Sequence, residues 1–183
     1  HTGGHNAVYI IKVKKHLKLF KKKIALSISH MNIREATIAD LEVLFGFQQG
    51  VILTERPFDP TIKDDPITYY DIEAMIVAPD TAVYVAEVGD QIVGCGYAQV
   101  REAKPYIMPE KYGYLGFMYV RPAYRGKGIN QAVINALKQW CTRRGLMELR
   151  LSVYSENIGA IQAYKKAGFA PLLIEMRMDL NQK

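Results

Sequence analysis

The sequence has few of the residues that build disulfide frameworks or metal sites. Among its 183 residues there are two cysteines, Cys95 and Cys141, and all four histidines precede Met31. Each cysteine lies among apolar residues, which is typical of a buried small side chain in a reducing compartment. We therefore expect a cytoplasmic protein that has no disulfide framework and binds no metal.

Long apolar runs are also missing, because no stretch approaches the roughly 18 residues that a membrane-spanning helix needs. We expect no integral membrane segment. Negative charge is absent from residues 1–30, which hold seven lysines and no aspartate or glutamate. Without those seven lysines, 17 basic residues stand against 18 acidic ones in residues 31–183. The net charge of +6 thus belongs to the first segment, and the rest of the chain offers no basic surface for nucleic acid.

Residues 1–30 end in Ser-His before Met31, a string that a common cloning junction leaves before an initiator methionine. We interpret these residues as cloning-derived and exclude them from the fold. The alternative is a native basic arm for a membrane surface or nucleic acid, because this segment mixes lysine with apolar residues. Our expectation is one domain at residues 31–183, with neither membrane nor nucleic acid as a partner.

From Met31 onward, stretches of strand pattern alternate with stretches of helix pattern. Thr37 and Asp40 form a T-x-x-D helix start, and Gly89-Asp90 is a hairpin turn. The predicted strands cover residues 32–36, 82–88, 91–100, 112–120, 147–154 and 172–180. The predicted helices begin at residues 37, 67, 129 and 157, and a loop with three prolines covers residues 54–66. The result is a single α/β (α+β) domain with a mixed sheet flanked by helices, in the order β-α-α-β-β-β-α-β-α-β.

The stretch from Arg121 to Asn130, RPAYRGKGIN, lies between an aromatic strand and a helix. The first amides of a helix lack partners within it, and the helix dipole adds partial positive charge there. Gly126 and Gly128 let the backbone curl around an anion, and Arg125 and Lys127 add full charges. A P-loop needs Ser or Thr after the lysine, and a Rossmann turn needs a third glycine. ATP and NAD are therefore disfavoured as ligands.

A second motif follows downstream, in which Asn157-x-x-Ala-x-x-x-Tyr164 leads to Gly168-Phe169. Because it carries both this motif and Val120-x-Pro-x-x-Arg125-Gly126-x-Gly128, the chain resembles the GNAT superfamily of acyl-CoA-dependent N-acyltransferases. The resemblance covers roughly residues 82–169. The resemblance implies a fold of that family and acetyl-CoA as the acyl donor. It implies that the following residues bind the donor: Met118, Tyr119, Val120, Arg125, Gly126, Lys127, Gly128, Ile129, Asn130, Gln131, Asn157 and Tyr164.

The resemblance also assigns roles to individual residues. Tyr164 is expected to protonate the departing thiolate as a general acid, and Asn157 is expected to hold the pantetheine arm. The predicted strand 112–120, which precedes the glycine turn, is expected to diverge from the predicted strand 147–154. The backbone of residues 118–120 can then pair with pantetheine. A backbone amide at Met118 or Tyr119 is the expected oxyanion donor, and Gly113 and Gly116 would permit a bulge or a close approach.

Two positions depart from the family pattern. Asn130 stands where the family usually has Gly or Ala, and Ser152 stands where enzymes acting on protein N-termini often carry a glutamate base. No general base is evident in the sequence. The candidates are Glu55, Glu87, Glu102, Tyr114 and Tyr119, although each is also compatible with a surface or packing role.

The expected acceptor is a primary amine on a small molecule or a peptide. Acidic residues in and beside the loop 54–66 would form a negatively charged rim that suits a cationic amine. The same residues are equally typical of a solvated loop. The rim comprises Glu55, Asp59, Asp64, Asp65, Asp71 and Glu73, against Arg56 and Lys63. Two further possibilities stay open: a homodimer, and a non-catalytic acyl-CoA sensor that keeps the cradle but has no turnover.

Overall fold

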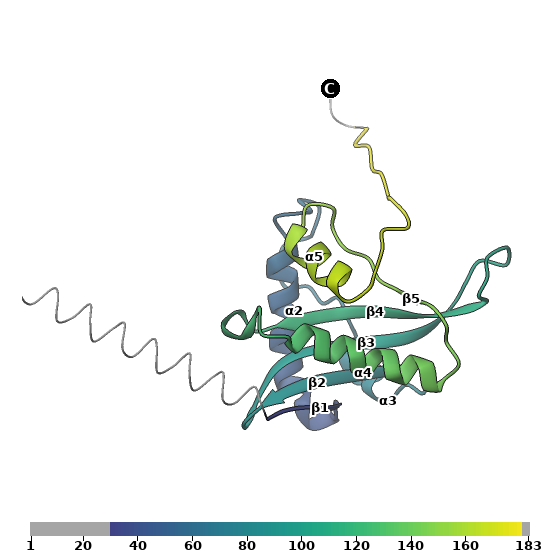
Figure 1. Ribbon diagram of the computed structural model, residues 1–183. Coiled ribbons are helices and arrows are strands. Elements are labelled where there is room, and N and C mark those ends of the chain that lie inside the picture. Colours follow the sequence, from purple (N-terminus) through teal and green to yellow (C-terminus); the bar gives the residue numbers. More distant parts are fainter. Residues whose placement is uncertain (1–29, 181–183) are drawn as a thin grey trace, which may run out of the picture.

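The computed structural model describes residues 30–180, and a five-stranded sheet runs through the middle of that part (Figure 1). The strands lie in sequence order, with each pair antiparallel except the last, which is parallel. They are β1 (Met31–Glu35), β2 (Thr81–Val88), β3 (Gln91–Glu102), β4 (Lys111–Val120) and β5 (Leu149–Arg150). The mixed sheet confirms the predicted fold class. Residues 1–29 lie outside the described part, and so do the expectations placed on them.

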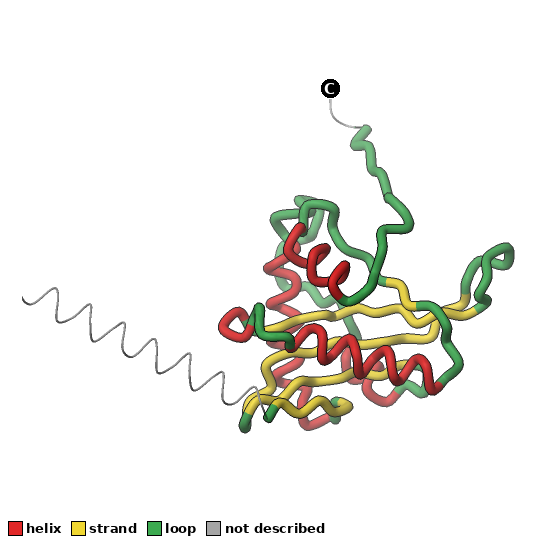
Figure 2. Tube along the Cα trace, viewed as in Figure 1, coloured by secondary structure: helices red, strands yellow, loops and turns green. Residues whose placement is uncertain are grey.

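Helices cover both faces of the sheet, as Figure 2 shows. One face packs against α2 (Leu41–Glu55) and α3 (Ile72–Val77), and the other against α4 (Ile129–Arg143). The last helix, α5 (Ile158–Lys166), lies beyond β4 and β5. Two hydrophobic clusters result, one on each side of the sheet. This double covering explains why β2 is buried along nearly its whole length.

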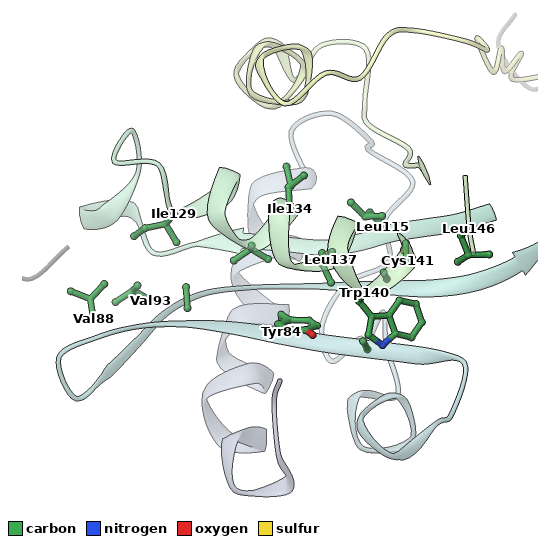
Figure 3. Packing of buried hydrophobic residues seen from close by; sticks show 14 residues of the cluster. Tyr84, Val88, Val93, Leu115, Ile129, Ile134, Leu137, Trp140, Cys141 and Leu146 are labelled. Carbon is green, nitrogen blue, oxygen red and sulfur yellow. The ribbon is translucent and has the colours of Figure 1, made fainter. Parts of the chain in front are cut away.

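Apolar side chains that recur at helical spacing along α4 are buried against the sheet, as Figure 3 shows. Val133 and Leu137 are fully buried, and Ile129, Trp140 and Cys141 lie within the same cluster. Each large apolar side chain buried in this way contributes about 1.5–3 kcal/mol. The cluster fixes α4 on the sheet, and with it the turn that precedes the helix.

The predicted start at Thr37 is confirmed, and a short 3₁₀ turn (Ile38–Asp40) leads into α2. The carboxylate of Asp40 accepts a hydrogen bond from the Thr37 backbone N–H at 2.7 Å. It also pairs with the Arg34 guanidinium at 2.8 Å, and this pairing lowers the pKa of Asp40 to about 2. Arg34 also binds Glu87 on β2 at 2.7 Å, so the charged cluster joins β1, β2 and the start of α2.

The second helix begins five residues later than predicted, at Ile72 rather than residue 67. Gln48, which is almost fully buried on α2, accepts the backbone N–H groups of Tyr69 and Tyr70 at 3.0 and 2.7 Å. Those amides are therefore held outside the helix. The Asp71 carboxylate then accepts the Ala74 N–H at 3.0 Å and caps the helix at its observed start.

Two predictions about the last part of the chain are wrong. The strand expected over residues 147–154 is limited to Leu149–Arg150, because β4 pairs with only these two residues. The segment 172–180, expected to be a strand, is neither strand nor helix, and its side chains are exposed. An alternating pattern marks a segment that can form a strand, but a strand also needs a partner beside it. In the described part of the chain, this segment has none.

Candidate active site

The end of β4 carries a bulge at the position where the donor site is expected. Tyr97 on β3 pairs with Gly116, but Cys95, two residues earlier, pairs with Tyr119, so β4 holds one extra residue. Phe117 within the bulge has a φ of 53°, an unusual value for a residue with a side chain. A Cβ on Gly116 would lie 2.7 Å from the Tyr97 ring. Position 116 therefore needs glycine, because a side chain there would overlap the Tyr97 ring.

Beyond the bulge, β4 and β5 are not paired. The parallel ladder consists of Gly113 with Leu149 and Tyr114 with Arg150. In the described residues, the β5-facing edge of β4 therefore has no ladder partner from Leu115 to Val120, while the β3-facing edge remains paired. The backbone of Met118, Tyr119 and Val120 is thus on an open edge, as the resemblance implies. An extended ligand can pair with such an edge as a further strand would.

The glycine turn lies at the end of this open edge and leads into α4. Gly126 and Gly128 have φ values of +72° and +83°, in the region that favours glycine, and Gly128 is the N-cap of α4. A Cβ built on either glycine would meet nothing within 4 Å. The amides that follow, at Ile129, Asn130 and Gln131, have no acceptor within the helix. The turn can therefore hold a phosphate anion, which fits the pyrophosphate of coenzyme A.

The two cations of the turn are bonded within it. The Nε of Arg125 donates to the Val120 carbonyl at 3.1 Å, and Lys127 donates to the Ala123 carbonyl. These bonds brace the turn. Asn130 is half-buried at the helix start. The side-chain NH₂ group of Gln131 donates to the side-chain oxygen (Oδ1) of Asn135, one turn along the helix, at 3.0 Å.

The second motif forms α5, and Asn157 is its N-cap. The side-chain oxygen of Asn157 accepts the Ala160 N–H at 3.1 Å, so only its NH₂ group is left for another ligand. Tyr164, two turns later, packs edge-on against Phe169 with ring centroids 6.0 Å apart. Burial raises the pKa of the Tyr164 hydroxyl to about 12, with smaller contributions from the charges of Glu55 and Tyr114. Glu55, at the end of α2, and Tyr114, on β4, are thus within electrostatic range of Tyr164.

Glu55 ends α2 and lies among tyrosines from several segments. Burial raises the pKa of its carboxyl group, and a hydrogen bond with Tyr69 opposes that rise. Burial also raises the pKa of Tyr69, to about 12, and that of Tyr154, and in both the negative charge of Glu55 adds to the effect. The charge of Glu55 therefore acts on four tyrosine hydroxyls, those of Tyr69, Tyr70, Tyr154 and Tyr164.

Each of the other four candidate bases contacts a partner of its own. Glu87 belongs to the charged cluster with Arg34, and Glu102 pairs with Lys111 at 3.1 Å at the far end of the β3–β4 hairpin. The Tyr114 hydroxyl donates to Ser152 at 3.1 Å. The Tyr119 ring packs against Phe47 with centroids 4.8 Å apart. Among the five candidates, Glu55 is the carboxylate that the structure brings near Tyr164.

The acidic rim is largely committed to internal bonds. Asp59 accepts hydrogen bonds from Thr61 and Arg177, Asp65 pairs with Arg56 at 2.8 Å, and Asp71 caps α3. Sequence reasoning did not single out Tyr69 or Tyr154 as part of the site. They come from separate segments with no recognisable motif, so only their shared position near Glu55 reveals them.

Comparisons with known proteins show which family the chain matches. The family model described as "Acetyltransferase (GNAT) family" matches residues 51–169. The chain is 38% identical over 61 residues to the uncharacterized N-acetyltransferase YobR of Bacillus subtilis, covering 33% of this chain but only 25% of that protein. It is 28% identical over 140 residues to an aminoglycoside N(6')-acetyltransferase type 1 of Stenotrophomonas maltophilia, covering 75% and 84% of the two chains.

Among solved structures, a predicted acetyltransferase with acetyl-CoA from Clostridium acetobutylicum has a similar fold. Its TM-score is 0.63 at 21% identity, over 82% of this chain and 96% of that one. Within residues 30–180, no helix combines the length and apolar character needed to cross a membrane. The same residues contain no group of three or more His, Cys, Asp or Glu side chains arranged to hold a metal ion.

Proposed function

Because the chain belongs to the acetyltransferase (GNAT) family, we propose that it transfers the acetyl group of acetyl-CoA to the amine of a small cationic acceptor by direct attack. The activity class that goes with this family is acetyl-CoA-dependent N-acyl transfer. One observation carries the proposal for this chain. The glycine turn at the start of α4 follows the part of β4 that β5 leaves unpaired, and Tyr164 on α5 packs against the same hydrophobic cluster as α4.

The binding residues divide into two sets. The amides at the start of α4, with Gly126 and Gly128, hold the pyrophosphate, since unpartnered N–H groups and the helix dipole both favour an anion. The open backbone of residues 118–120 pairs with the amides of the pantetheine arm, and the NH₂ group of Asn157 donates to the same arm. Acetyl-CoA supplies an activated thioester to this edge. A backbone N–H of Met118 or Tyr119 donates to the thioester carbonyl oxygen as negative charge develops on it.

Tyr164 acts on the leaving group. A hydroxyl with a pKa of about 12 keeps its proton at neutral pH, so it is ready to donate to the sulfur. As the amine nitrogen bonds to the carbonyl carbon, the carbon–sulfur bond breaks and the Tyr164 proton passes to the thiolate. An acceptor that binds as an ammonium loses one proton before the attack and a second as the amide forms; both pass to Glu55 or to water, and proton exchange restores Tyr164. The thiol and the amide are then the products.

The acceptor binds on the Glu55 side of Tyr164. A half-buried carboxylate attracts an ammonium group more strongly than an exposed one, because little water screens it there. Tyr69 and Tyr154 add hydroxyl groups that bind further polar atoms of the acceptor. One relative is named as an aminoglycoside N(6')-acetyltransferase. Small polyamines and aminosugars are therefore the acceptors that we expect.

Thiol release during incubation with acetyl-CoA and a panel of amines tests the proposal. The panel contains an aminoglycoside, a linear polyamine, free lysine, and a neutral alcohol of matched size as the control. We expect Tyr164→Phe to lower kcat by about 10²–10⁴-fold while the Kd for acetyl-CoA stays within twofold. Tyr106→Phe is the matched control, because Tyr106 is an exposed tyrosine on the far hairpin. Full turnover in Tyr164→Phe contradicts the assigned role.

Glu55→Gln tests the acceptor site separately. We expect KM for cationic amines to rise at least tenfold, with acetyl-CoA affinity unchanged, because the amide keeps the shape but removes the charge. The control is Glu73→Gln, a change of the same kind on the exposed side of α3. An unchanged KM contradicts this placement. Tight acetyl-CoA binding without thiol release for any amine would instead favour a non-catalytic sensor.

A further inference from the structure

The face of the sheet that packs against α2 becomes polar and aromatic toward the hairpin that joins β3 and β4 (Figure 1). Tyr97 on β3 lies in the hydrophobic cluster under α2, and because strand side chains alternate, Gln99 and Arg101 follow it on the same face. Their register partners on β4 are Tyr114 and Tyr112. These four partners are half-buried, and we name them the outer face of β3 and β4.

Arg101 is a half-buried cation on this face whose charge no carboxylate neutralises. Its guanidinium lies over the Tyr114 ring, 3.6 Å from the centroid, and its Nε donates to the side-chain oxygen of Gln99 at 3.2 Å. Within residues 30–180, every other half-buried arginine pairs with an aspartate or a glutamate: Arg34, Arg56 and Arg150. A guanidinium that has lost part of its hydration without gaining a carboxylate favours an anionic ligand.

The stacked position of Arg101 suits the binding of two oxygens at once. A guanidinium that lies flat on a ring keeps its terminal N–H groups in its own plane, where they can bind a carboxylate or a phosphate in a bidentate manner. Burial raises the pKa of the neighbouring Tyr97 hydroxyl, and the Arg101 charge opposes that rise. Arg150 on β5 lies over the Tyr112 ring at 4.1 Å, but it donates to Glu148. Arg101 is therefore the uncompensated cation of the outer face.

Two tyrosine rings link Arg101 to the residues assigned to the reaction. The charge of Glu55 acts on Tyr70, whose ring centroid lies 5.7 Å from that of Tyr97. Tyr97 in turn is within electrostatic range of Arg101. Glu55 is also the carboxylate within electrostatic range of Tyr164. The carboxylate assigned to the ammonium group and the uncompensated guanidinium thus belong to one continuous group of side chains.

We propose that Arg101 binds an anionic group of the acceptor, a carboxylate or a phosphate, while Glu55 binds its amine. This inference rests on the proposed function and narrows the acceptors expected there. An amino acid, or an aminosugar that bears a phosphate, satisfies both charges, whereas a polyamine places a second cation beside Arg101. Charge complementarity of this kind selects one ligand and disfavours the other.

Calorimetry with pairs of amines that differ in one anionic group tests the proposal, with coenzyme A present throughout. A series of ω-amino acids is compared with the ω-amino alcohols of the same chain length, and glucosamine phosphate is compared with glucosamine. We expect the anionic member of a pair to bind the parent about tenfold more tightly. In Arg101→Gln the two members should bind within about twofold of each other. The amino acid pairs report on a carboxylate, and the aminosugar pair reports on a phosphate.

Arg144→Gln is the matched control. Arg144 also lies over an aromatic ring, 4.2 Å from the Trp140 centroid, and has no carboxylate partner in the described residues, but it is exposed at the end of α4. Its variant should keep the preference of the parent. Arg101→Lys keeps the charge but not the planar pair of donors, and should reduce the preference in part. The assignment therefore does not depend on the folding of one variant.

Equal binding of both members of every pair by the parent, or a preference that survives both substitutions of Arg101, overturns the proposal. Thiol release from acetyl-CoA with the same pairs tests the proposed function separately. Amino alcohols and glucosamine that react as efficiently as their anionic partners would refute the role of Arg101 and leave N-acetyl transfer intact. A binding preference that depends on Arg101, without thiol release from any amine, would refute the transfer and support the anion site.

Discussion

Replacing Gly128 by alanine separates two effects at the glycine turn: the cost of a positive φ for a residue with a side chain, and the crowding of a ligand that binds there. Gly128 has a φ of +83°, and a non-glycine residue in this region costs roughly 1–2 kcal/mol. A loss of that size lowers Tm by about 2–8 °C in a chain of this length. The added Cβ meets no protein atom within 4 Å, so the protein itself is not crowded.

Any loss of coenzyme A affinity in Gly128→Ala that backbone strain does not explain must therefore come from contact between the new methyl group and the ligand. If the pyrophosphate approaches the amides at the start of α4, the new methyl group lies in its way. We expect the Kd for coenzyme A, measured by calorimetry, to rise at least tenfold, which corresponds to about 1.4 kcal/mol. Calorimetry is carried out well below the Tm of the variant, so that the unfolded fraction does not contribute.

Gly145→Ala provides the matched control. Gly145 follows the other end of α4 and has a φ of +73°, and a Cβ added there would likewise meet no atom within 4 Å. The substitution should lower Tm by a similar amount and leave coenzyme A affinity unchanged. Equal affinity in Gly128→Ala and the parent would refute the reasoning, because it would show that the ligand does not approach this turn. Equal loss of affinity in both variants would attribute the effect to strain rather than to contact.

Two further predictions concern stability. The pairing with Arg34 lowers the pKa of Asp40 from its ordinary value near 4 to about 2. It therefore stabilises the fold by about 2 kcal/mol when the pH is above 4, and this contribution is lost as the pH falls toward 2. Urea unfolding between pH 6 and 2 should thus show a smaller decline for Asp40→Asn than for the parent, and parallel declines would contradict the assignment. Leu137→Ala should cost about 2–5 kcal/mol, since Leu137 is fully buried, whereas exposed Leu53→Ala should stay within about 0.5 kcal/mol. Equal urea midpoints for these two variants would contradict the packing on α4.

Local signals in the sequence predicted most of the fold. The Thr37–Asp40 start, the turn at Gly89, and the stripe on α4 depend on contacts between residues close in sequence, or on one face packing against any apolar layer. For this reason they could be predicted without a structure. The conformation of the turn before α4 was predictable for a related reason, since Gly126 and Gly128 are needed for its positive φ values.

The acceptor side could not be predicted in the same way. Glu55 was one of five candidate bases, and no pattern in the chain distinguishes it from the others. Its position near Tyr164 depends on how α2 and α5 pack around β4, and the roles of Tyr69 and Tyr154 depend on the same packing. The late start of α3 likewise depends on Gln48, a buried side chain more than twenty residues upstream of that helix.

By itself the sequence determined the mixed α/β class, the order of nearly all elements and the location of the glycine turn before α4, because periodicity and glycine conformation are local properties. Only the tertiary structure decided that β4 and β5 separate after two residue pairs, that Glu55 comes within electrostatic range of Tyr164, and that residues 172–180 do not form a strand. The physical reason is the same in each case. A strand or a site requires partners from distant segments, and a pattern in one segment shows what that segment can pair with but not whether the partner is there.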